Sequence, residues 1–179
     1  MTPPPEQVVE LVRRLATSPW PTSEAERVAW FTQHGLPTHG RAAAEEGSTL
    51  SAHAAADGPP GWGTTQWHVF DDAFVGLCWF LWRDASDRET RAAAELLATA
   101  FDARWTLVER LDDPVQGFTA LWSVDDVHVD LYFHAPRVTP HGHPIDSVVQ
   151  LHVDHAARAA TADAVAASAA SPDRSYPDV

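Results

Sequence analysis

Strict alternation of apolar and polar side chains in two segments limits the fold more than any other feature. In VHVDLYFH, residues 127–134, the odd positions are apolar and the even positions carry His128, Asp130, Tyr132 and His134. The segment 146–153 and the residue after it repeat the pattern, with the polar positions Gln150, His152 and Asp154. Successive side chains of a strand point to opposite sheet faces. We therefore expect two strands that each have one buried and one polar face.

A third segment, Ala73–Trp82 (AFVGLCWFLW), is apolar at both alternating sets of positions. A strand of this kind belongs in the middle of a sheet that is covered on both sides. It is also too short to span a bilayer, which needs about 20 residues. Cys78 lies within it, where a thiolate would be costly, so we expect a core residue and not a nucleophile.

The remaining elements alternate between helical and extended patterns. Helices are expected at 5–17, from Ser23 to about Gly35, at 86–101 and at 156–169, and further strands at 61–70, 104–111 and 116–124. The predicted class is α+β, with a mainly antiparallel sheet of about six strands. Two N-terminal helices, one central helix and a C-terminal helix accompany that sheet.

At 179 residues one domain is the expectation, and we assign it to residues 1–170. Within it, 38–60 is expected to be a mobile loop, with a short helix or strand inside it as an alternative, because small, polar and breaker residues dominate it. Residues 171–179 are expected to be a disordered tail. The first residues, MTPPPEQVVELVRR, lack the order of a signal peptide, and one cysteine excludes an internal disulfide, so we expect a cytoplasmic protein.

The charge balance limits the partners. All 12 basic residues are arginine, there are 25 acidic residues, and the formal net charge is −13. Such a surface repels nucleic acid phosphates, so we expect no nucleic-acid binding and favour a basic protein partner. Neither a membrane nor a particular oligomeric state is indicated.

The polar positions of the two alternating strands allow three interpretations. They are the solvated face of an antiparallel sheet, a face that binds a protein, or a metal or catalytic site. The third requires the strands to be neighbours in a suitable register, which the sequence does not determine. His141 and His143, in the loop between the strands, form a His-x-His pattern that is a weak metal signal.

Further candidate interface residues lie in turns. Tracing the expected strands places Asp71, Asp72, Asp125 and Asp126 at one end of the sheet, and Asp112 and Asp113 at the other. The first four form an acidic rim that could help to dock a basic partner. Trp62 follows Gly58-Pro59-Pro60-Gly61, so it is either a partly exposed interface anchor or packed on the core. Histidine protonation would reduce the negative charge, so binding is expected to weaken in mild acid.

No nucleotide-binding glycine loop, GxSxG elbow or HExxH helix is present in the sequence. No catalytic, metal or cofactor-binding residue is therefore assigned. The expectation is a protein that is not an enzyme.

Three segments carry a family resemblance: LxxLATSPWPTSEAERVAWFTQHGLP, FLWRDASDRETRAAAELLATAF and VVQLHVDHAARAA. They resemble small uncharacterised α+β proteins of actinobacteria, many of which lie among polymorphic toxin and secretion loci. The resemblance covers about residues 8–165 and transfers no site residue. It implies an immunity or chaperone-like protein, and together with the acidic charge it favours an immunity or antitoxin-type protein that neutralises a basic partner. A small metal-dependent enzyme using His128, Asp130, His152 or Asp154, and a chaperone for a secreted substrate, are the alternatives.

Overall fold

The computed structural model describes residues 3–36, 50–55, 62, 65–82, 85–139 and 141–170. Within these ranges the chain forms four helices and nine strands, in the order α-α-β-β-β-α-β-β-β-β-β-β-α. The α+β class and the antiparallel sheet expected from the sequence are confirmed. The mobile loop predicted at 38–60 lies outside the described residues except for 50–55, which form a strand, and the predicted tail 171–179 lies outside them entirely.

Seven strands form one sheet in the order β1-β2-β3-β9-β6-β5-β4, and every neighbouring pair is antiparallel. Their bounds are Leu50–Ala55 (β1), Thr65–Phe70 (β2), Ala73–Leu81 (β3), Thr106–Asp113 (β4), Gly117–Val124 (β5), Val127–His134 (β6) and Val148–His155 (β9). The last strand of the chain therefore lies in the middle. It joins the β1–β2–β3 unit to the β4–β5–β6 meander.

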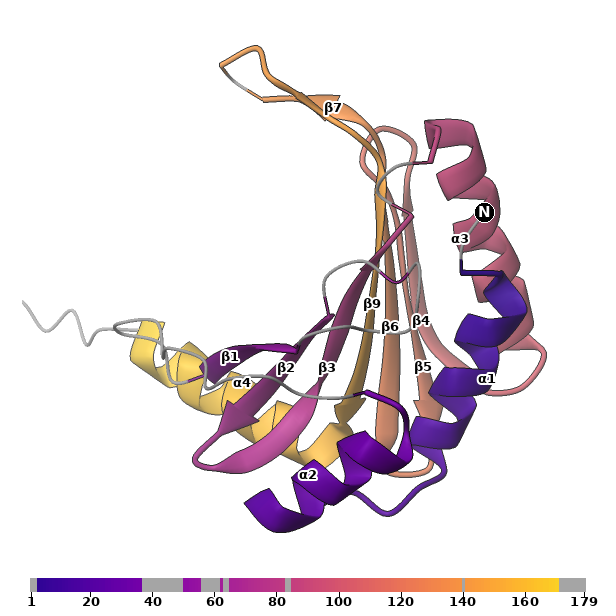
Figure 1. Ribbon diagram of the computed structural model, residues 1–179. Helices are drawn as coiled ribbons and strands as arrows, with labels where there is room; N and C mark the ends of the chain where they lie inside the picture. The colour runs from indigo at the N-terminus through magenta and orange to yellow at the C-terminus, as the bar shows by residue number, and fades with distance from the viewer. Residues whose placement is uncertain are drawn as a thin grey trace, which may run out of the picture.

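Two helices, α1 (Pro5–Ala16) and α3 (Asp87–Asp102), cover one face of the sheet (Figure 1). Both are amphipathic: α1 buries its valines and leucines, and α3 buries Ala93, Leu97 and Phe101. A capping box begins α3, because the Ser86 hydroxyl accepts from the Glu89 amide while the Glu89 carboxylate accepts from the Ser86 amide. The shorter α2 (Glu24–Gln33) packs below them.

The core lies between these helices and the sheet. Trp79 of β3 and Trp122 of β5 are fully buried there, together with the odd-numbered residues of β6 and with Val149, Leu151 and Val153 of β9. Trp62 is only 8% exposed and contacts Trp79, with ring centroids 5.5 Å apart. The interpretation of Trp62 as an exposed interface anchor is therefore wrong, because the ring packs on the helix-covered face.

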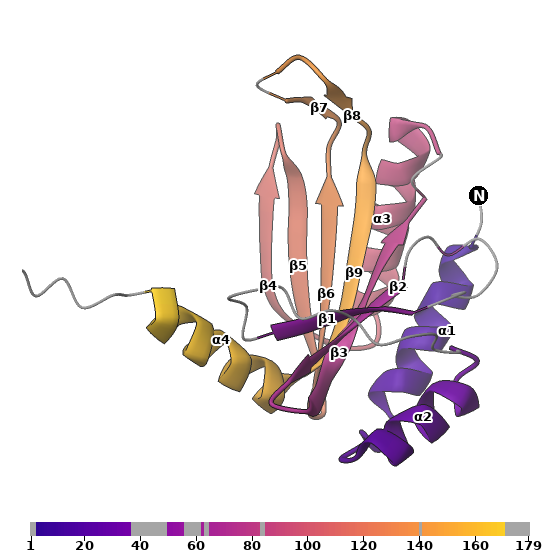
Figure 2. The same cartoon turned by 60° about the vertical axis from the view of Figure 1, so that its left-hand side comes forward.

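The opposite face of the sheet carries a different set of elements. Helix α4 (Ala156–Ala170) follows β9 without a loop and contacts β3 and β9. At the other end, a small hairpin of β7 (Arg137–Val138) and β8 (Pro144–Ile145) projects beyond the sheet. Figure 2 looks onto this face, and among the described elements α4 is the one helix on that side.

The acidic turns lie as the traced strands predict. Asp71 and Asp72 form the two-residue turn between β2 and β3, both with positive φ, and Asp125 and Asp126 connect β5 to β6. Since β3 and β6 are each antiparallel to β9, both turns lie at the end of the sheet where α4 begins. All four carboxylates are exposed.

Candidate functional site

The alternating polar side chains of β6 and β9 are neighbours. Asp130 of β6 is paired with His152 of β9, and His128 of β6 is paired with Asp154 of β9. Each histidine is therefore directly opposite an aspartate of the other strand. Tyr132 is paired with Gln150 in the same register. We call the seven residues His128, Asp130, Tyr132, His134, Gln150, His152 and Asp154 the polar face.

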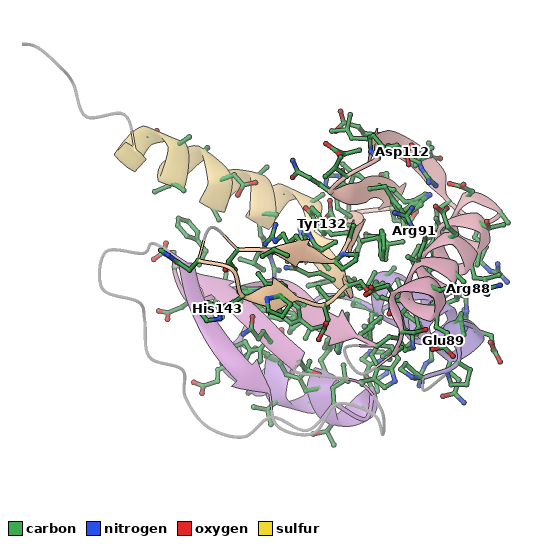
Figure 3. The ribbon with its side chains drawn as sticks, turned by 90° about the horizontal axis from the view of Figure 1, so that it is seen from above. Arg88, Glu89, Arg91, Asp112, Tyr132 and His143 are labelled. Carbon is green, nitrogen blue, oxygen red and sulfur yellow. The ribbon has the colours of Figure 1, made fainter. Side chains whose placement is uncertain are left out.

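The polar face lies on the α4 side of the sheet. Seen from above in Figure 3, Tyr132 is on this side, whereas Arg88, Glu89 and Arg91 lie with α3 on the other. All seven side chains are partly buried and none is fully exposed. The face is thus less open to solvent than the simple solvated-face interpretation implies.

The Gln150 side chain contacts two histidines of the polar face and the thiol of Cys78. Its side-chain oxygen accepts from His134 Nε2 at 3.4 Å, and its amide nitrogen lies 2.6 Å from His152 Nε2 and 3.5 Å from Cys78 Sγ. An amide nitrogen only donates, so His152 Nε2 is the acceptor and the ring hydrogen is on Nδ1. Burial raises the pKa of Cys78 to about 12, which keeps it a thiol, as its position in an apolar strand predicts.

Asp154 is the most unusual group of the polar face. It lies over Gly76 of β3, which offers no side chain to displace it. Its side chain is 18% exposed, and its buried Oδ1 has no hydrogen-bond partner among the described residues. Burial raises the pKa of Asp154 to about 8, and the nearby carboxylates of Asp130 and Asp163 add to the effect.

The pKa of His152 is lowered, whereas that of Asp154 is raised. Burial, and then the neighbouring His68, lower the pKa of His152 to about 4. Its Nδ1 is 3.9 Å from Asp154 Oδ2, too far for a hydrogen bond. Near pH 6 the imidazole and the Asp154 carboxyl are therefore both uncharged, and protonation of His152 does not cause the charge loss in mild acid that we expected from the sequence.

The pKa values of Asp130 and Tyr132, two further residues of the polar face, are also raised. Burial raises the pKa of Asp130 to about 6, and Asp163 adds to this effect, whereas His128 opposes it. Burial and the surrounding carboxylates raise the pKa of Tyr132 to about 12, so the phenol keeps its proton. Mild acid therefore removes negative charge here through the aspartates.

No protein-family model, curated protein or solved structure matches the chain. The site has to be interpreted from its own geometry. Within the described ranges, no group of three or more His, Cys, Asp or Glu side chains is arranged to hold a metal ion. His141 and His143 are exposed in the β7–β8 hairpin, away from the polar face.

The described helices also include none that is long and apolar enough to cross a membrane. Of the candidate interface residues, the seven of the polar face are brought together, and the four turn aspartates lie at the α4 end of the same sheet. Trp62 lies on the other face.

Sequence reasoning missed Asp163 and Gly76. Asp163 lies in an alanine-rich segment in which nothing marks it as part of a site. The one available signal is that the expected helix follows the last strand without a loop, so that α4 begins beside the polar face. Gly76 has no local signal, because its role depends on pairing with a strand that is far away in the sequence.

Proposed function

We propose that the protein is a non-enzymatic acidic binding protein of the immunity or antitoxin type, which neutralises a basic protein partner in the cytoplasm. The observation that carries the proposal is the set of carboxylates on the polar face and at its α4 end. None of the described arginines forms an ion pair with Asp130, Asp163 or the four turn aspartates. Carboxylates without cationic partners attract a cationic surface.

The arrangement of the elements supports the same function. The polar face carries a phenol, imidazoles and an amide, which are groups suited to a protein interface. Helix α4 and the β7–β8 hairpin flank it at opposite ends. Steering by the net charge of −13 would speed capture of a basic partner.

The test uses a basic protein encoded beside the gene for this chain. We expect the two to form a complex whose Kd rises at least tenfold between 50 and 500 mM NaCl, because salt screens the attraction. Tyr132→Ala and Gln150→Ala, on the polar face, should weaken it, whereas Arg88→Ala, on the opposite side, should not. In co-expression the wild-type chain should relieve the partner's toxicity. Binding unaffected by salt and by both polar-face variants would overturn the proposal.

A small metal-dependent enzyme using the polar face is the second candidate. The opposite pKa shifts of His152 and Asp154 favour it, because such pairs occur in sites that transfer protons. Stoichiometric zinc or iron in the purified protein, lost in His152→Ala, would favour the enzyme over the binding protein.

A further inference from the structure

We infer that helix α4 is a pH-dependent arm, which stays docked beside the polar face while the carboxyl groups of Asp130 and Asp154 are protonated and moves away from it when they ionise. The movement takes place at the junction of β9 and α4, where no loop separates the two elements. It needs neither a ligand nor a partner, so it does not depend on the proposed function. Because α4 flanks one end of the polar face, its position determines how freely that face can be reached.

Helix α4 is held near its first two turns. Nη1 of Arg158 donates to the carbonyl oxygens of Pro21 and Phe74, each at 2.8 Å. Ala162 is the one buried side chain among those of α4 that the structure describes, and residues 163–168 are exposed. In Figure 2 the rest of the helix extends away from the sheet. Since a single alanine buries little apolar surface, a change of charge beside it is able to alter the docking of α4.

Three carboxyl groups lie where α4 meets the sheet. Asp130 of β6 and Asp154 of β9 are one diagonal step apart in the paired strands, and Asp163 of α4 comes directly after the buried Ala162. The charge of Asp163 acts on both sheet residues. None of the described arginines forms an ion pair with Asp130 or Asp163. Ionisation of the two sheet residues therefore adds charge of the same sign as Asp163, and moving α4 away relieves the repulsion.

The position of Asp154 suits a neutral carboxyl group and not a carboxylate. Its Oδ1 is buried over Gly76, in the space that a Cβ there would take, and has no hydrogen-bond partner among the described residues. A negative charge at this atom would have neither a donor nor water beside it, which is unfavourable. We expect the ionised side chain to turn toward solvent on the polar face, which is the side of the sheet that carries α4 and Asp163.

The other charged or titratable groups around the two aspartates do not remove this repulsion near neutral pH. They are His152 on β9, Cys78 on β3, His68 on β2, His128 and Tyr132 on β6, and Arg158 and Asp163 on α4. Cys78 and Tyr132 keep their protons because the pKa of each is raised to about 12, and His152 is uncharged because burial lowers its pKa to about 4. The Arg158 guanidinium is bonded to two backbone carbonyls. His128 opposes the effect at Asp130 without cancelling it.

A rise in pH therefore favours the open position of α4. Burial raises the pKa of Asp130 to about 6 and that of Asp154 to about 8 while α4 is docked. When α4 moves, water reaches both groups and the charge of Asp163 is removed, so both pKa values fall toward the ordinary 3.8. A group whose pKa is higher in the docked state favours docking at low pH and stops doing so as pH rises through that pKa. Docking should thus weaken as pH rises through 6 and then 8.

The position of α4 is measured by pulsed electron paramagnetic resonance at pH 5, 7 and 9. One nitroxide label is attached at Ser168→Cys in α4 and the other at Val115→Cys in the turn between β4 and β5, both exposed positions, in a Cys78→Ala background. We expect one short distance at pH 5 and a second, longer one at pH 9, with the ratio of open to docked molecules rising at least tenfold. Amide chemical shifts of the unlabelled wild type should change over the same pH range in residues 155–163 and stay constant in β5.

Three variants identify the groups responsible. Asp154→Asn does not ionise at position 154, so the change in the open-to-docked ratio should fall below threefold. Asp163→Arg should reverse the trend, because its guanidinium attracts the ionised sheet aspartates and keeps α4 docked at pH 9. Asp163 is exposed, so this variant folds normally and keeps the test valid if the internal one does not. Asp146→Asn, which removes an exposed carboxylate beyond the other end of β9, is the matched control and should behave as wild type.

An unchanged distance at all three pH values in wild type would overturn the inference. So would release of α4 at pH 9 in Asp163→Arg to the same extent as in wild type, or loss of the pH effect in Asp146→Asn, which would place the titrating group elsewhere. If the amide shifts of β5 change together with those of α4, the whole domain unfolds and α4 does not move as a separate arm, which overturns the inference as well.

Discussion

Oδ1 of Asp154 occupies the space that a side chain on Gly76 would need. A Cβ at position 76 would overlap this oxygen and also press against the Val153 carbonyl. β3 and β9 are paired so that the two residues are directly opposite. The glycine therefore allows the Asp154 carboxyl group to lie across β3.

Gly76→Ala is expected to destabilise the protein by about 2–3 kcal/mol, because overpacking of a close-packed site is unfavourable. The double variant Gly76→Ala/Asp154→Ala should recover part of that loss, since the contact with the Val153 carbonyl remains. Urea unfolding of the four proteins in a double-mutant cycle measures the coupling. Strict additivity of the two single changes would contradict the contact.

Asp154→Asn should make the protein more stable at pH 8 and leave it unchanged near pH 4. The pKa of Asp154 is about 8 in the folded state, against an ordinary 3.8, so the unfolded chain loses the proton first as pH rises. The wild-type carboxyl therefore lowers the free energy of unfolding progressively between pH 4 and pH 8. Asparagine does not ionise and avoids this loss, which has an upper limit on the order of 5 kcal/mol.

Urea unfolding at pH 4, 5, 6, 7 and 8 gives the difference between Asp154→Asn and wild type. The opposite contribution of His152 is present in both proteins and cancels. Asp146→Asn, in which the removed carboxylate is exposed, should show no comparable trend. A gain of the same size at every pH would argue against titration of Asp154.

Ser86→Ala is expected to lower the free energy of unfolding by about 1 kcal/mol, the usual cost of losing an N-cap hydroxyl. The hydroxyl accepts from the Glu89 amide at 3.4 Å and donates to the Glu89 carboxylate at 2.6 Å. Ser168→Ala in exposed α4, where the hydroxyl only donates to the Ala164 carbonyl of its own helix, is the control. Thermal unfolding should separate the two variants, and equal effects would show that the cap contributes nothing.

Arg158→Met should loosen α4. Nη1 of Arg158 donates to the carbonyl oxygens of Pro21 and Phe74, each at 2.8 Å, and so attaches the first turn of α4 to β3 and to the segment after α1. Losing these charge-assisted bonds is expected to cost about 1–3 kcal/mol. Hydrogen exchange should accelerate in residues 157–168, and Arg137→Met in the exposed hairpin should leave it unchanged.

Alternation in 127–134 and 146–153 predicted both strands and the side chains of the polar face, although the second strand runs from Val148 to His155, two residues later than predicted. It could not predict that the strands are neighbours, because the connecting residues 135–147 permit several arrangements. The crosswise pairing of His128 with Asp154 and of Asp130 with His152 depends on that arrangement. The sequence thus identified the groups but not their contacts.

Two strands were missed for a physical reason, because β7 and β8 have two residues each, too short for any periodicity. β1 lies among small and polar residues that favour loops, so the sequence indicated a strand there only as one alternative. An irregularity between His68 and Val69 also shifts the register of β2 and β3. As a result Phe74, which strict alternation would place on the same side as Cys78, instead contacts Trp20 and Phe31 in the core.

The central place of β9 has a consequence for synthesis on the ribosome. Until residue 155 has emerged, β3 and β6 have no partner on one edge, although β3 is made much earlier. The apolar β3 is exposed for the longest time, and unpaired strand edges of this kind promote aggregation. The nascent chain therefore depends on β9 to close the sheet, and versions interrupted before residue 148 would be expected to accumulate as insoluble material.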